Sequence, residues 1–303
     1  MDSIRNPGVS VIVPTLNAEK ELSALLRALR AQTLEADEII VVDSSSTDDT
    51  VSICRAEQVR VLEVRREDFD HGQTRDMALR MSAGDIVVFL TQDAIPANED
   101  FLERLIAPLS EEGVAVCTGR QLPRKDATRM EQLIRRYNYP AESSIRSKAD
   151  VPRLGIKTFF SSDVCAAYNR RLYMALGGFD YPIKTNEDML FAAKVINAGL
   201  RIAYAADAQV YHSHHFTLRE QYRRNYIQGY EIERHAEALN HVPQVSEGVN
   251  MVKYVSAELL RHGHVLEFVR FGLDCCARLM GSRAGERAYR KEARTLIDRR
   301  GEM

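Results

Sequence analysis

The sequence has little net charge, and this absence limits the partners to consider. Among its 303 residues, 41 Lys and Arg stand against 43 Asp and Glu, which gives a formal charge of −2. With 45% apolar and 28% charged residues, the composition is that of an ordinary folded globular protein. It argues against a disordered chain and against a protein that seeks nucleic acid.

Paired cysteines and long apolar runs are also missing. The five cysteines are odd in number and show no C-x-x-C spacing, so neither a disulfide framework nor a thiolate zinc site is indicated. No segment reaches the roughly 18 uncharged apolar residues of a membrane-spanning helix, and the opening MDSIRNPG has no apolar signal core. We expect a cytoplasmic protein that contacts a membrane at most peripherally, on the inner face of the cell membrane.

What the sequence does contain is an alternation of strand and helix signals. Apolar, often β-branched runs predict strands at 9–13, 38–42, 59–64 and 85–90, and they alternate with helical patterns at 19–31, 51–57 and 74–81. Alternating strands and helices with short connections predict an α/β fold with a doubly wound, mostly parallel sheet. Such sheets bind ligands at the carboxyl ends of their strands.

The second half gives less regular signals. They predict helices at 100–109 and 186–198 and strands at 114–118, 159–167, 201–205 and 208–211. Residues 119–156 form a long polar connection with three prolines, which is typical of a functional loop or lid.

Two aspartates close predicted strands at the ligand-binding edge. The Asp43 carboxylate can accept hydrogen bonds from a base N–H or a ribose hydroxyl, or it can simply hold a turn. Asp93 can bind a hard divalent cation that bridges the phosphates of a nucleotide and stabilises a diphosphate leaving group. Each residue alone is a weak signal.

Four segments at or near these strand ends follow one another along the chain: VSVIVPTLNAEKEL, EIIVVDSSSTDDT, HGQTRDMAL and DIVVFLTQDAIP. In combination, they resemble the family 2 glycosyltransferases of the GT-A fold. The resemblance implies that Asp43 holds the base of a nucleotide-sugar donor and that Arg75 faces the nucleotide. It also implies that the loop after the first strand contacts the nucleoside through Pro14, Thr15 and Asn17.

The metal motif of that family is Asp-x-Asp, whereas this chain reads Thr91-Gln92-Asp93. We therefore expect Asp93 to bind Mg²⁺ or Mn²⁺ and Gln92 to lie on the nucleotide sugar. His212 and His214, in YHSHHF, lie where the family often places a histidine beside the metal or the diphosphate, and imidazole is a reasonable ligand for such an ion. Ordinary hydrogen-bonded or surface histidines are the alternative.

The GGFD segment at 177–180 and the NED segment at 186–188 resemble elements of the same transferases, in which the final aspartate is the general base. Inverting transfer needs a carboxylate that removes the acceptor hydroxyl proton as that oxygen attacks the anomeric carbon opposite the diphosphate. We expect Asp188 to be this base, with Glu187 as the second candidate. An acidic pair in a first helical turn also complements the helix dipole, which is the alternative.

A finer resemblance, to the rhamnosyltransferase-like branch of the family, covers nearly all of residues 9–230. It is carried by FDHGQTRDMAL, LTQDAIP, GRQLPR, YNYP, FFSSDVCAAY, NED and HSHHF. It implies dTDP-L-rhamnose as the donor and, as acceptor, a glycan or lipid-linked glycan of a growing surface polysaccharide. It further implies that His71 and Gly72 shape the nucleotide-sugar pocket and that Arg120 and Gln121 reach sugar or acceptor hydroxyls.

Two other functions are compatible with parts of this pattern: a transferase for another nucleotide sugar, and a nucleotide-sugar-binding protein without transferase activity. A nucleotidyltransferase is disfavoured, because it typically has a Gly-rich, basic phosphate loop after its first strand, and PTLNAEKE is not one.

We expect a GT-A catalytic domain over residues 1–217 and a helical, basic extension over 218–303. The basic character of the extension is clearest at the end of the chain, where residues 261–303 carry ten Arg and Lys against six Asp and Glu. Near the start of the extension, a row of arginines at helical spacing either contacts diphosphate or acidic lipid, or forms a solvated helix face; the row is Arg219, Arg223 and Arg224.

Residues 265–280 predict a helix with an apolar face and with Arg270, Asp274 and Arg278 on one side. Such a helix can lie on a membrane, pack on the catalytic domain or form a homodimer. Acidic residues within the helix weaken the membrane interpretation.

Overall fold

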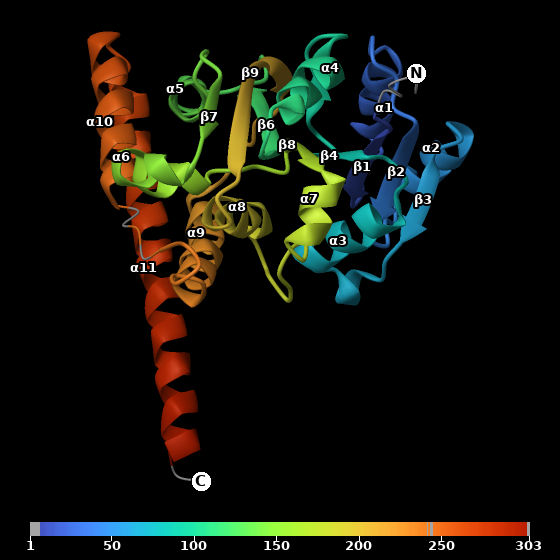
Figure 1. Cartoon of the computed structure of the whole chain (residues 1–303). Helices are drawn as coiled ribbons and strands as arrows, with labels where there is room; N and C mark the ends of the chain where they lie inside the picture. The colour runs from blue at the N-terminus through green and yellow to red at the C-terminus, as the bar shows by residue number, and fades with distance from the viewer. Residues whose placement is uncertain (1–6, 241, 243–244, 302–303) are drawn as a thin grey trace.

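The computed structural model describes residues 7–240, 242 and 245–301. Its centre is a nine-stranded sheet in the order β3-β2-β1-β4-β8-β6-β9-β5, with β7 pairing with β9 beside this path (Figure 1). The strands are β1 (Val9–Thr15), β2 (Glu38–Asp43), β3 (Arg60–Glu63), β4 (Ile86–Leu90), β5 (Ile95–Pro96), β6 (Val114–Leu122), β7 (Ser144–Arg146), β8 (Cys165–Asn169) and β9 (Arg201–Tyr211).

The predicted α/β fold class is confirmed, and the sheet is more evenly mixed than we expected. The pairs β1–β2, β2–β3, β1–β4 and β6–β9 are parallel. The pairs β4–β8, β6–β8, β5–β9 and β7–β9 are antiparallel. The parallel half is thus the one whose strand and helix signals alternate regularly in the sequence.

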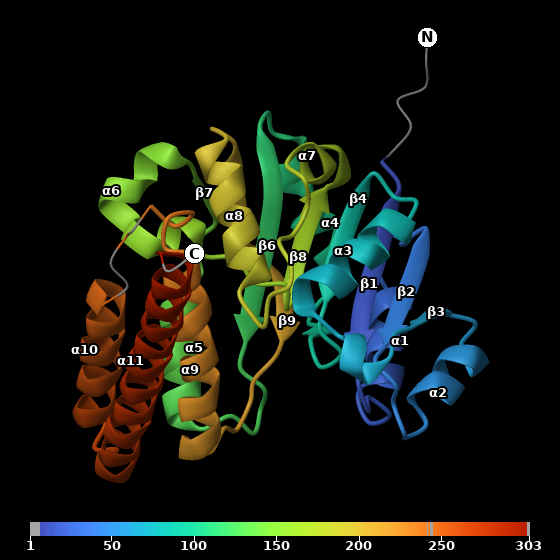
Figure 2. The same ribbon diagram turned by 90° about the horizontal axis from the view of Figure 1, so that it is seen from below.

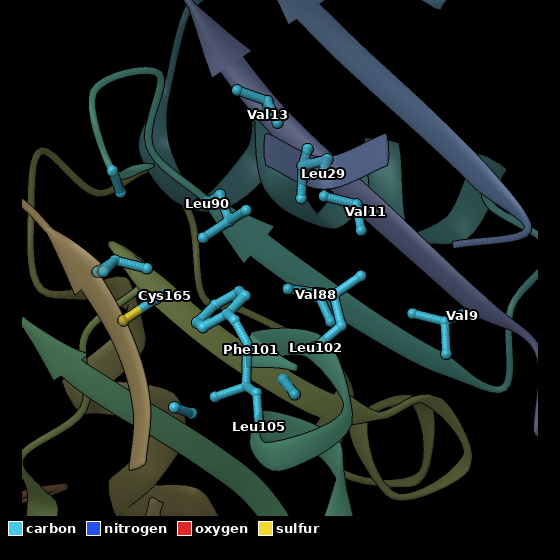
Figure 3. Close-up of a cluster of buried hydrophobic side chains, with 14 of the residues drawn as sticks. Val9, Val11, Val13, Leu29, Val88, Leu90, Phe101, Leu102, Leu105 and Cys165 are labelled. Atoms are coloured by element: carbon cyan, nitrogen blue, oxygen red, sulfur yellow. The ribbon is translucent and has the colours of Figure 1, made fainter. Parts of the chain in front are cut away.

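Helices cover both faces of the sheet. Most are short: α1 (Leu22–Arg30), α2 (Thr50–Ala56), α3 (His71–Met81), α4 (Phe101–Ile106), α5 (Arg129–Asn138), α6 (Val151–Leu154), α7 (Arg170–Ala175) and α8 (Glu187–Asn197). Alternate side chains of β1 explain the two layers, because Val9, Val11 and Val13 pack with α1 and α4 whereas Ile12 packs with α3 and α8. Figure 3 shows the first of these layers, where Phe101 and Leu105 lie beside Val88 and Cys165.

Two strand predictions in the second half of the chain need correction. The strand expected at 159–167 begins only at Cys165, because residues 155–159 form a 3₁₀ helix that buries Phe159. A short buried apolar run does not distinguish these two conformations. The strands expected at 201–205 and 208–211 are one strand, β9, whose pairing with β6 shifts register after Gly119.

The connection predicted over 119–156 is not an open loop. It contains the end of β6, helix α5, strand β7 and helix α6. Helix α5 begins where the Thr128 hydroxyl accepts a hydrogen bond from the Glu131 amide (3.2 Å), and it buries Leu133 and Ile134. The polar sequence reflects a helix with one buried face, because that side of α5 packs on the C-terminal helices.

The C-terminal helices are α9 (Leu218–Arg234), α10 (Val245–Arg261) and α11 (Val265–Gly301). Figure 1 shows α11 running along α9, and glycines explain their close approach: a Cβ at Gly281 or Gly285 would clash with carbonyl oxygens of α9. Leu133 and Ile134 of α5 share a core with residues of α10 and α11. The division of the chain at 217 and 218 stays a prediction.

Two absences in the sequence have structural counterparts. All five cysteines are free, and Cys54, Cys117 and Cys165 are buried. Within the described residues, no helix combines the length and apolar character needed to cross a membrane.

Candidate active site

Asp43, at the end of β2, is buried and holds the turn that follows it. Its carboxylate accepts hydrogen bonds from the Thr15 hydroxyl (3.2 Å), the Ser46 hydroxyl (2.5 Å) and the Ser46 amide (2.8 Å). A carboxylate has about four acceptor sites, so this one retains capacity for one further donor. Asp43 therefore holds this turn, and its contact with a nucleotide base stays a prediction.

Polar side chains tie the loops after β1, β2 and β4 together. The amide of Asn17 donates to the Ser46 hydroxyl (2.8 Å), and its side-chain oxygen accepts from the Thr47 amide (2.9 Å). The Gln92 side chain pairs with both backbone groups of Leu16, at 2.8 and 3.3 Å. The structure thus brings Thr15, Asn17, Asp43 and Gln92 to one edge, next to Pro14 in β1, and their contacts with a nucleotide stay predictions.

Asp93, His212 and His214 form a cluster that can hold a metal ion. Asp93 follows β4, the two histidines follow β9, and ligand atoms of the three lie within 4.8 Å of one another. The Asp93 Oδ2 atom is 3.5 Å from His212 Nε2 and 3.7 Å from His214 Nδ1. One carboxylate and two imidazoles suit a divalent transition metal such as Mn²⁺.

The hydrogen bonds of Gln121 determine which ring nitrogen of His212 carries the proton. The Gln121 Oε1 atom accepts a hydrogen bond from Arg135, which can only donate, and it also lies 2.9 Å from His212 Nδ1. Nδ1 must therefore carry the proton, and the lone pair of Nε2 faces Asp93. Burial, followed by the charge of Arg135, lowers the pKa of His212 to about 2, so the ring is neutral.

Arg120 and Gln121, predicted together, point to different partners. The Nε atom of Arg120 donates to the Tyr139 carbonyl oxygen (3.2 Å), whereas Gln121 lies buried behind the metal cluster. Their contacts with sugar or acceptor hydroxyls stay predictions. In addition, the contact with His212 Nδ1 lets Gln121 orient that ring.

Three arginines surround the metal cluster. Arg124 donates to the Asp93 carbonyl oxygen (2.7 Å), and Arg135 reaches Gln121. The Arg224 guanidinium lies over the Phe216 ring, 4.4 Å from its centroid, and burial lowers the pKa of Arg224. Two carboxylates, those of Asp93 and Glu131, lie among these three guanidiniums. The surroundings therefore keep an excess of positive charge that is complementary to an anion such as diphosphate.

Asp188 and Glu187 begin α8 and have different environments. Glu187 is buried, and its Oε1 atom lies 3.0 Å from the Arg75 guanidinium. Asp188 is partly exposed and accepts hydrogen bonds from the amides of Asp163 (3.1 Å) and Met189 (2.7 Å). Burial, and then the charges of Glu187 and Asp163, raise the pKa of Asp188 well above its usual range. Asp188 therefore binds a proton more strongly than an ordinary aspartate does, and its role as the base stays a prediction.

Asp163 and Tyr168 were not predicted from the sequence. The Tyr168 hydroxyl donates to Asp163 (2.5 Å), while Asp163 Oδ2 and Arg75 Nε face each other at 3.4 Å without a hydrogen bond. Burial raises the pKa of Asp163 to about 7, against the opposing charge of Arg75. The signal available for both was the segment FFSSDVCAAY, which the resemblance included but no candidate used.

The structure places Arg75 among the carboxyl groups of Asp163, Glu187 and Asp188, called here the carboxylate cluster. Its guanidinium is buried, and it donates to His71 Nδ1 (3.1 Å) as well as contacting Glu187 and Asp163. Because arginine only donates, Nδ1 of His71 is an acceptor and the neutral ring carries its proton on Nε2. The contacts of Arg75 and His71 with a nucleotide stay predictions.

Gly72 has a packing reason to be glycine. A Cβ there would clash with the Asp180 carbonyl oxygen, so the glycine lets α3 approach the loop after Gly178. Asp70 fixes the same contact, because its carboxylate caps α3 through the Gln73 amide (2.9 Å) and accepts from the Ile183 amide (2.6 Å). The expected role of Gly72 in a sugar pocket stays a prediction.

Residues 162–164 connect the metal cluster to the carboxylate cluster. The Ser162 hydroxyl accepts from Gln121 (3.0 Å), the Asp163 amide donates to Asp188, and the Val164 carbonyl accepts from the Thr91 amide (3.2 Å). A candidate metal site and a candidate base thus lie on either side of one short segment. This arrangement can accommodate an anionic leaving group at one cluster and a hydroxyl nucleophile at the other.

A sheet edge with these two clusters fits a glycosyltransferase of the GT-A class. Residues 10–177 match the family model described as Glycosyl transferase family 2. The chain belongs to this family.

Two relatives resemble most of the chain. It is 40% identical over 223 residues to O-antigen chain rhamnosyltransferase RfbN of Salmonella typhimurium (strain LT2), which covers 73% of this chain and 71% of the relative. It is 42% identical over 225 residues to O-antigen chain rhamnosyltransferase WbaN of Salmonella anatum, which covers 74% and 71%.

Solved structures show the same fold at lower identity. A mannosyltransferase, PcManGT from Pyrobaculum calidifontis, in complex with GDP-Man and Mn²⁺ aligns with a TM-score of 0.64 at 20% identity, over 93% of this chain and 88% of that one. S. aureus TarS 1-349 in complex with UDP-GlcNAc aligns with a TM-score of 0.56 at 18% identity, over 94% and 92%. These matches support the GT-A fold.

Proposed function

We propose that this chain transfers L-rhamnose from dTDP-L-rhamnose, with inversion, to a glycan or lipid-linked glycan in surface polysaccharide synthesis. The donor and the acceptor class come from the similarity to the two Salmonella rhamnosyltransferases, which extends over nearly three quarters of the chain. The geometric observation that carries the proposal is the placement of Asp188 across residues 162–164 from the metal cluster.

The metal cluster would receive the diphosphate of the donor. Asp93, His212 and His214 would hold Mg²⁺ or Mn²⁺, and such an ion neutralises charge on a diphosphate leaving group when bound. Gln121 orients His212 for this task, and the three arginines Arg124, Arg135 and Arg224 add positive charge around it. At the other end of the nucleotide, the remaining acceptor capacity of Asp43 suits a base N–H.

Asp188 would act as the base in the transfer step. The acceptor oxygen forms a bond to the anomeric carbon, the bond from that carbon to the diphosphate oxygen breaks, dTDP leaves, and the hydroxyl proton passes to the Asp188 carboxylate. Its raised pKa gives the carboxylate a greater proton affinity than an exposed aspartate has. The Arg75 guanidinium contacts the Glu187 carboxylate at 3.0 Å, and we assign proton transfer to Asp188 instead.

A thermal-stability screen of nucleotide sugars, with and without Mn²⁺ or Mg²⁺, tests donor binding. Saturation at about 100 times Kd stabilises a fold by about 2.7 kcal/mol, which a melting curve resolves. We expect dTDP-L-rhamnose to stabilise the chain more than UDP-GlcNAc or GDP-mannose, more strongly with Mn²⁺, and we expect slow release of dTDP in the absence of acceptor.

Each outcome separates one alternative. Stabilisation by a different nucleotide sugar would replace rhamnose as the donor. Stabilisation without release or transfer of sugar would favour a nucleotide-sugar-binding protein. If no nucleotide sugar stabilises the fold, the transferase proposal fails.

A further inference from the structure

The outward face of α11 is apolar along the first half of the helix. Leu266 is 81% exposed, Val269 55%, Leu273 53% and Met280 64%. Together with the exposed Cys276, they recur at intervals of three and four residues and so form one line along the helix, called here the α11 stripe. Contiguous exposed apolar surface of this kind marks an interaction site.

The acidic residues of this segment do not lie on the exposed side. Between residues 260 and 283, all of which the structure describes, the acids are Glu267 and Asp274. Glu267 accepts a hydrogen bond from the Met130 amide (2.9 Å) at the start of α5, and Asp274 is buried against Arg278 (2.5 Å). These two acidic residues therefore do not weaken the interpretation of the exposed side of α11 as a membrane-binding face.

Basic residues flank the α11 stripe. Arg270 lies one helical turn after Leu266, and Arg283 lies one turn after Met280. Both are exposed, and within the described part of the chain neither has a carboxylate within 4.0 Å. The face therefore combines an apolar line with uncompensated positive charge.

We propose that the α11 stripe docks on an anionic lipid bilayer, with α11 lying in the plane of the interface. An apolar line flanked by arginines matches the acyl boundary and the acidic headgroups of such a surface. A second copy of this chain is a poorer occupant, because a symmetric contact along the stripe gathers Arg270 and Arg283 of both copies around one interface, and this face offers no carboxylate to oppose them.

The position of the stripe gives the docking a consequence for the active site. Phe271 of α11 and Val255 and Leu259 of α10 pack on Leu133 and Ile134 of α5, and Figure 2 shows these helices side by side. The next residue of α5, Arg135, reaches the Gln121 that orients His212. Helices α11 and α5 would thus lie between a docked bilayer and the metal cluster. This placement suits a lipid-linked acceptor, which rests on the proposed function.

Co-sedimentation of the full chain with vesicles tests the docking. We expect binding to vesicles of phosphatidylcholine with phosphatidylglycerol, little binding to phosphatidylcholine alone, and loss of binding as salt is raised. The double variant Arg270→Gln/Arg283→Gln should bind about 25-fold more weakly, since each basic residue near an anionic surface contributes about fivefold.

The apolar part of the surface is tested by Leu266→Glu/Leu273→Glu, which should bind at least about tenfold more weakly because two charges enter the acyl boundary. Met81→Glu is the matched control, because Met81 is 47% exposed in α3, which packs on β1 and β2 away from α11. All variants should keep their stabilisation by dTDP-L-rhamnose, so a failure of docking is distinguishable from a failure of the proposed function.

Three results would overturn the proposal. One is the absence of vesicle binding, and another is equal binding to neutral and anionic vesicles. The third is self-association without lipid that Leu273→Glu abolishes, since it would assign the stripe to a second copy of the chain.

Discussion

Two regions at the same sheet edge differ in how their charged side chains are paired. In the Asp43 region (residues 15–17 and 43–50), the charged side chain of Asp43 is satisfied by Thr15 and Ser46, and the buried group left without a partner is a neutral one, the Ser44 hydroxyl. In the Asp188 region (Arg75, Asp163, Tyr168, Glu187 and Asp188), buried charges face each other, and Arg75 Nε and Asp163 Oδ2 have no hydrogen-bond partner. The first region is held in place by its own hydrogen bonds, and the second contains carboxyl groups whose pKa values are raised, which is a common feature of functional sites.

The largest effect should come from Asp188→Asn. The amide cannot take the acceptor proton, so kcat for sugar transfer should fall by about 10² to 10⁴. Binding of the donor should change little, since the metal cluster and the Asp43 region are untouched. Steady-state transfer assays combined with donor titration by calorimetry measure the two quantities separately.

Asp180→Asn is the matched control for Asp188, because Asp180 pairs with Lys194 of the same helix α8 at the surface (2.7 Å). It should keep kcat within a few-fold, as expected for an exposed ion pair. Full transfer activity in Asp188→Asn would remove Asp188 from the base role and leave Glu187 as the candidate.

The second effect is on stability. Arg75→Met leaves Asp163 and Glu187 buried without their counter-charge, so the free energy of unfolding in urea should fall by about 3 to 5 kcal/mol. In the Asp43 region, Ser46→Ala removes hydrogen bonds of a neutral hydroxyl and should cost about 1 kcal/mol. Equal losses for the two variants would contradict the contrast between the regions.

Arg55→Met is the control for removal of an arginine as such. Its partner Glu63 lies 3.9 Å away and both side chains are well exposed, so the free energy of unfolding should change by less than about 0.5 kcal/mol.

The third effect concerns the metal cluster. Gln121→Leu removes the acceptor that keeps the proton of His212 on Nδ1, and Mn²⁺ should bind about 10 to 100 times more weakly, as measured by calorimetry or by the EPR signal of free Mn²⁺. Arg135 retains Glu131 as a partner (2.7 Å), so the fold should persist. Gln209→Leu, which changes a glutamine of β9 that bonds only to the backbone, should leave Mn²⁺ affinity unchanged.

The sequence predicted the parallel half of the fold well and the antiparallel half poorly, for a physical reason. An apolar run such as 38–42, bounded by turn residues and helical patterns, indicates a buried strand from local sequence alone. By contrast, β7 and β8 are short strands whose place depends on partners far along the chain, as in the pairing of Cys165 with Leu90. Helix α5 had a local signal, the Thr128 and Glu131 pair, that the polar composition of 119–156 concealed.

For the site, the sequence could indicate the strand-end residues Asp43 and Asp93 because their position follows from the topology. It could not show that Arg75 is paired with Glu187, since that contact depends on how α3 packs beside α8. Nor could it indicate Asp163, whose importance comes from burial and from its neighbours Tyr168 and Asp188. Electrostatic environments of this kind are properties of the assembled fold.

The smallest effect is a pH dependence whose sign differs between the two regions. Burial raises the pKa of Asp163 to about 7, from about 4 in an unfolded chain. Between these values the folded state holds a proton that the unfolded state has lost, so stability is greatest at the acidic end and falls as the pH rises towards 7, by at most about 1.4 kcal/mol per pH unit. In the Asp43 region, burial raises the pKa of Asp48, but hydrogen bonds from Thr50 and Glu19 outweigh it and the pKa is lowered. The contribution of Asp48 to stability is therefore lost only as the pH falls through that lowered pKa.

Urea denaturation of the chain and of Asp163→Asn between pH 5 and pH 8 measures this difference. The variant should lose part of the decline in stability towards pH 7, because asparagine does not titrate while its side-chain oxygen can still accept from Tyr168. Asp48→Asn should leave the decline unchanged, since its titration lies below this range. An unaltered slope in Asp163→Asn would mean that Asp163 stays ionised beside Arg75. The contrast between proton-holding carboxyl groups in the Asp188 region and hydrogen-bonded, ionised carboxylates in the Asp43 region would then fail.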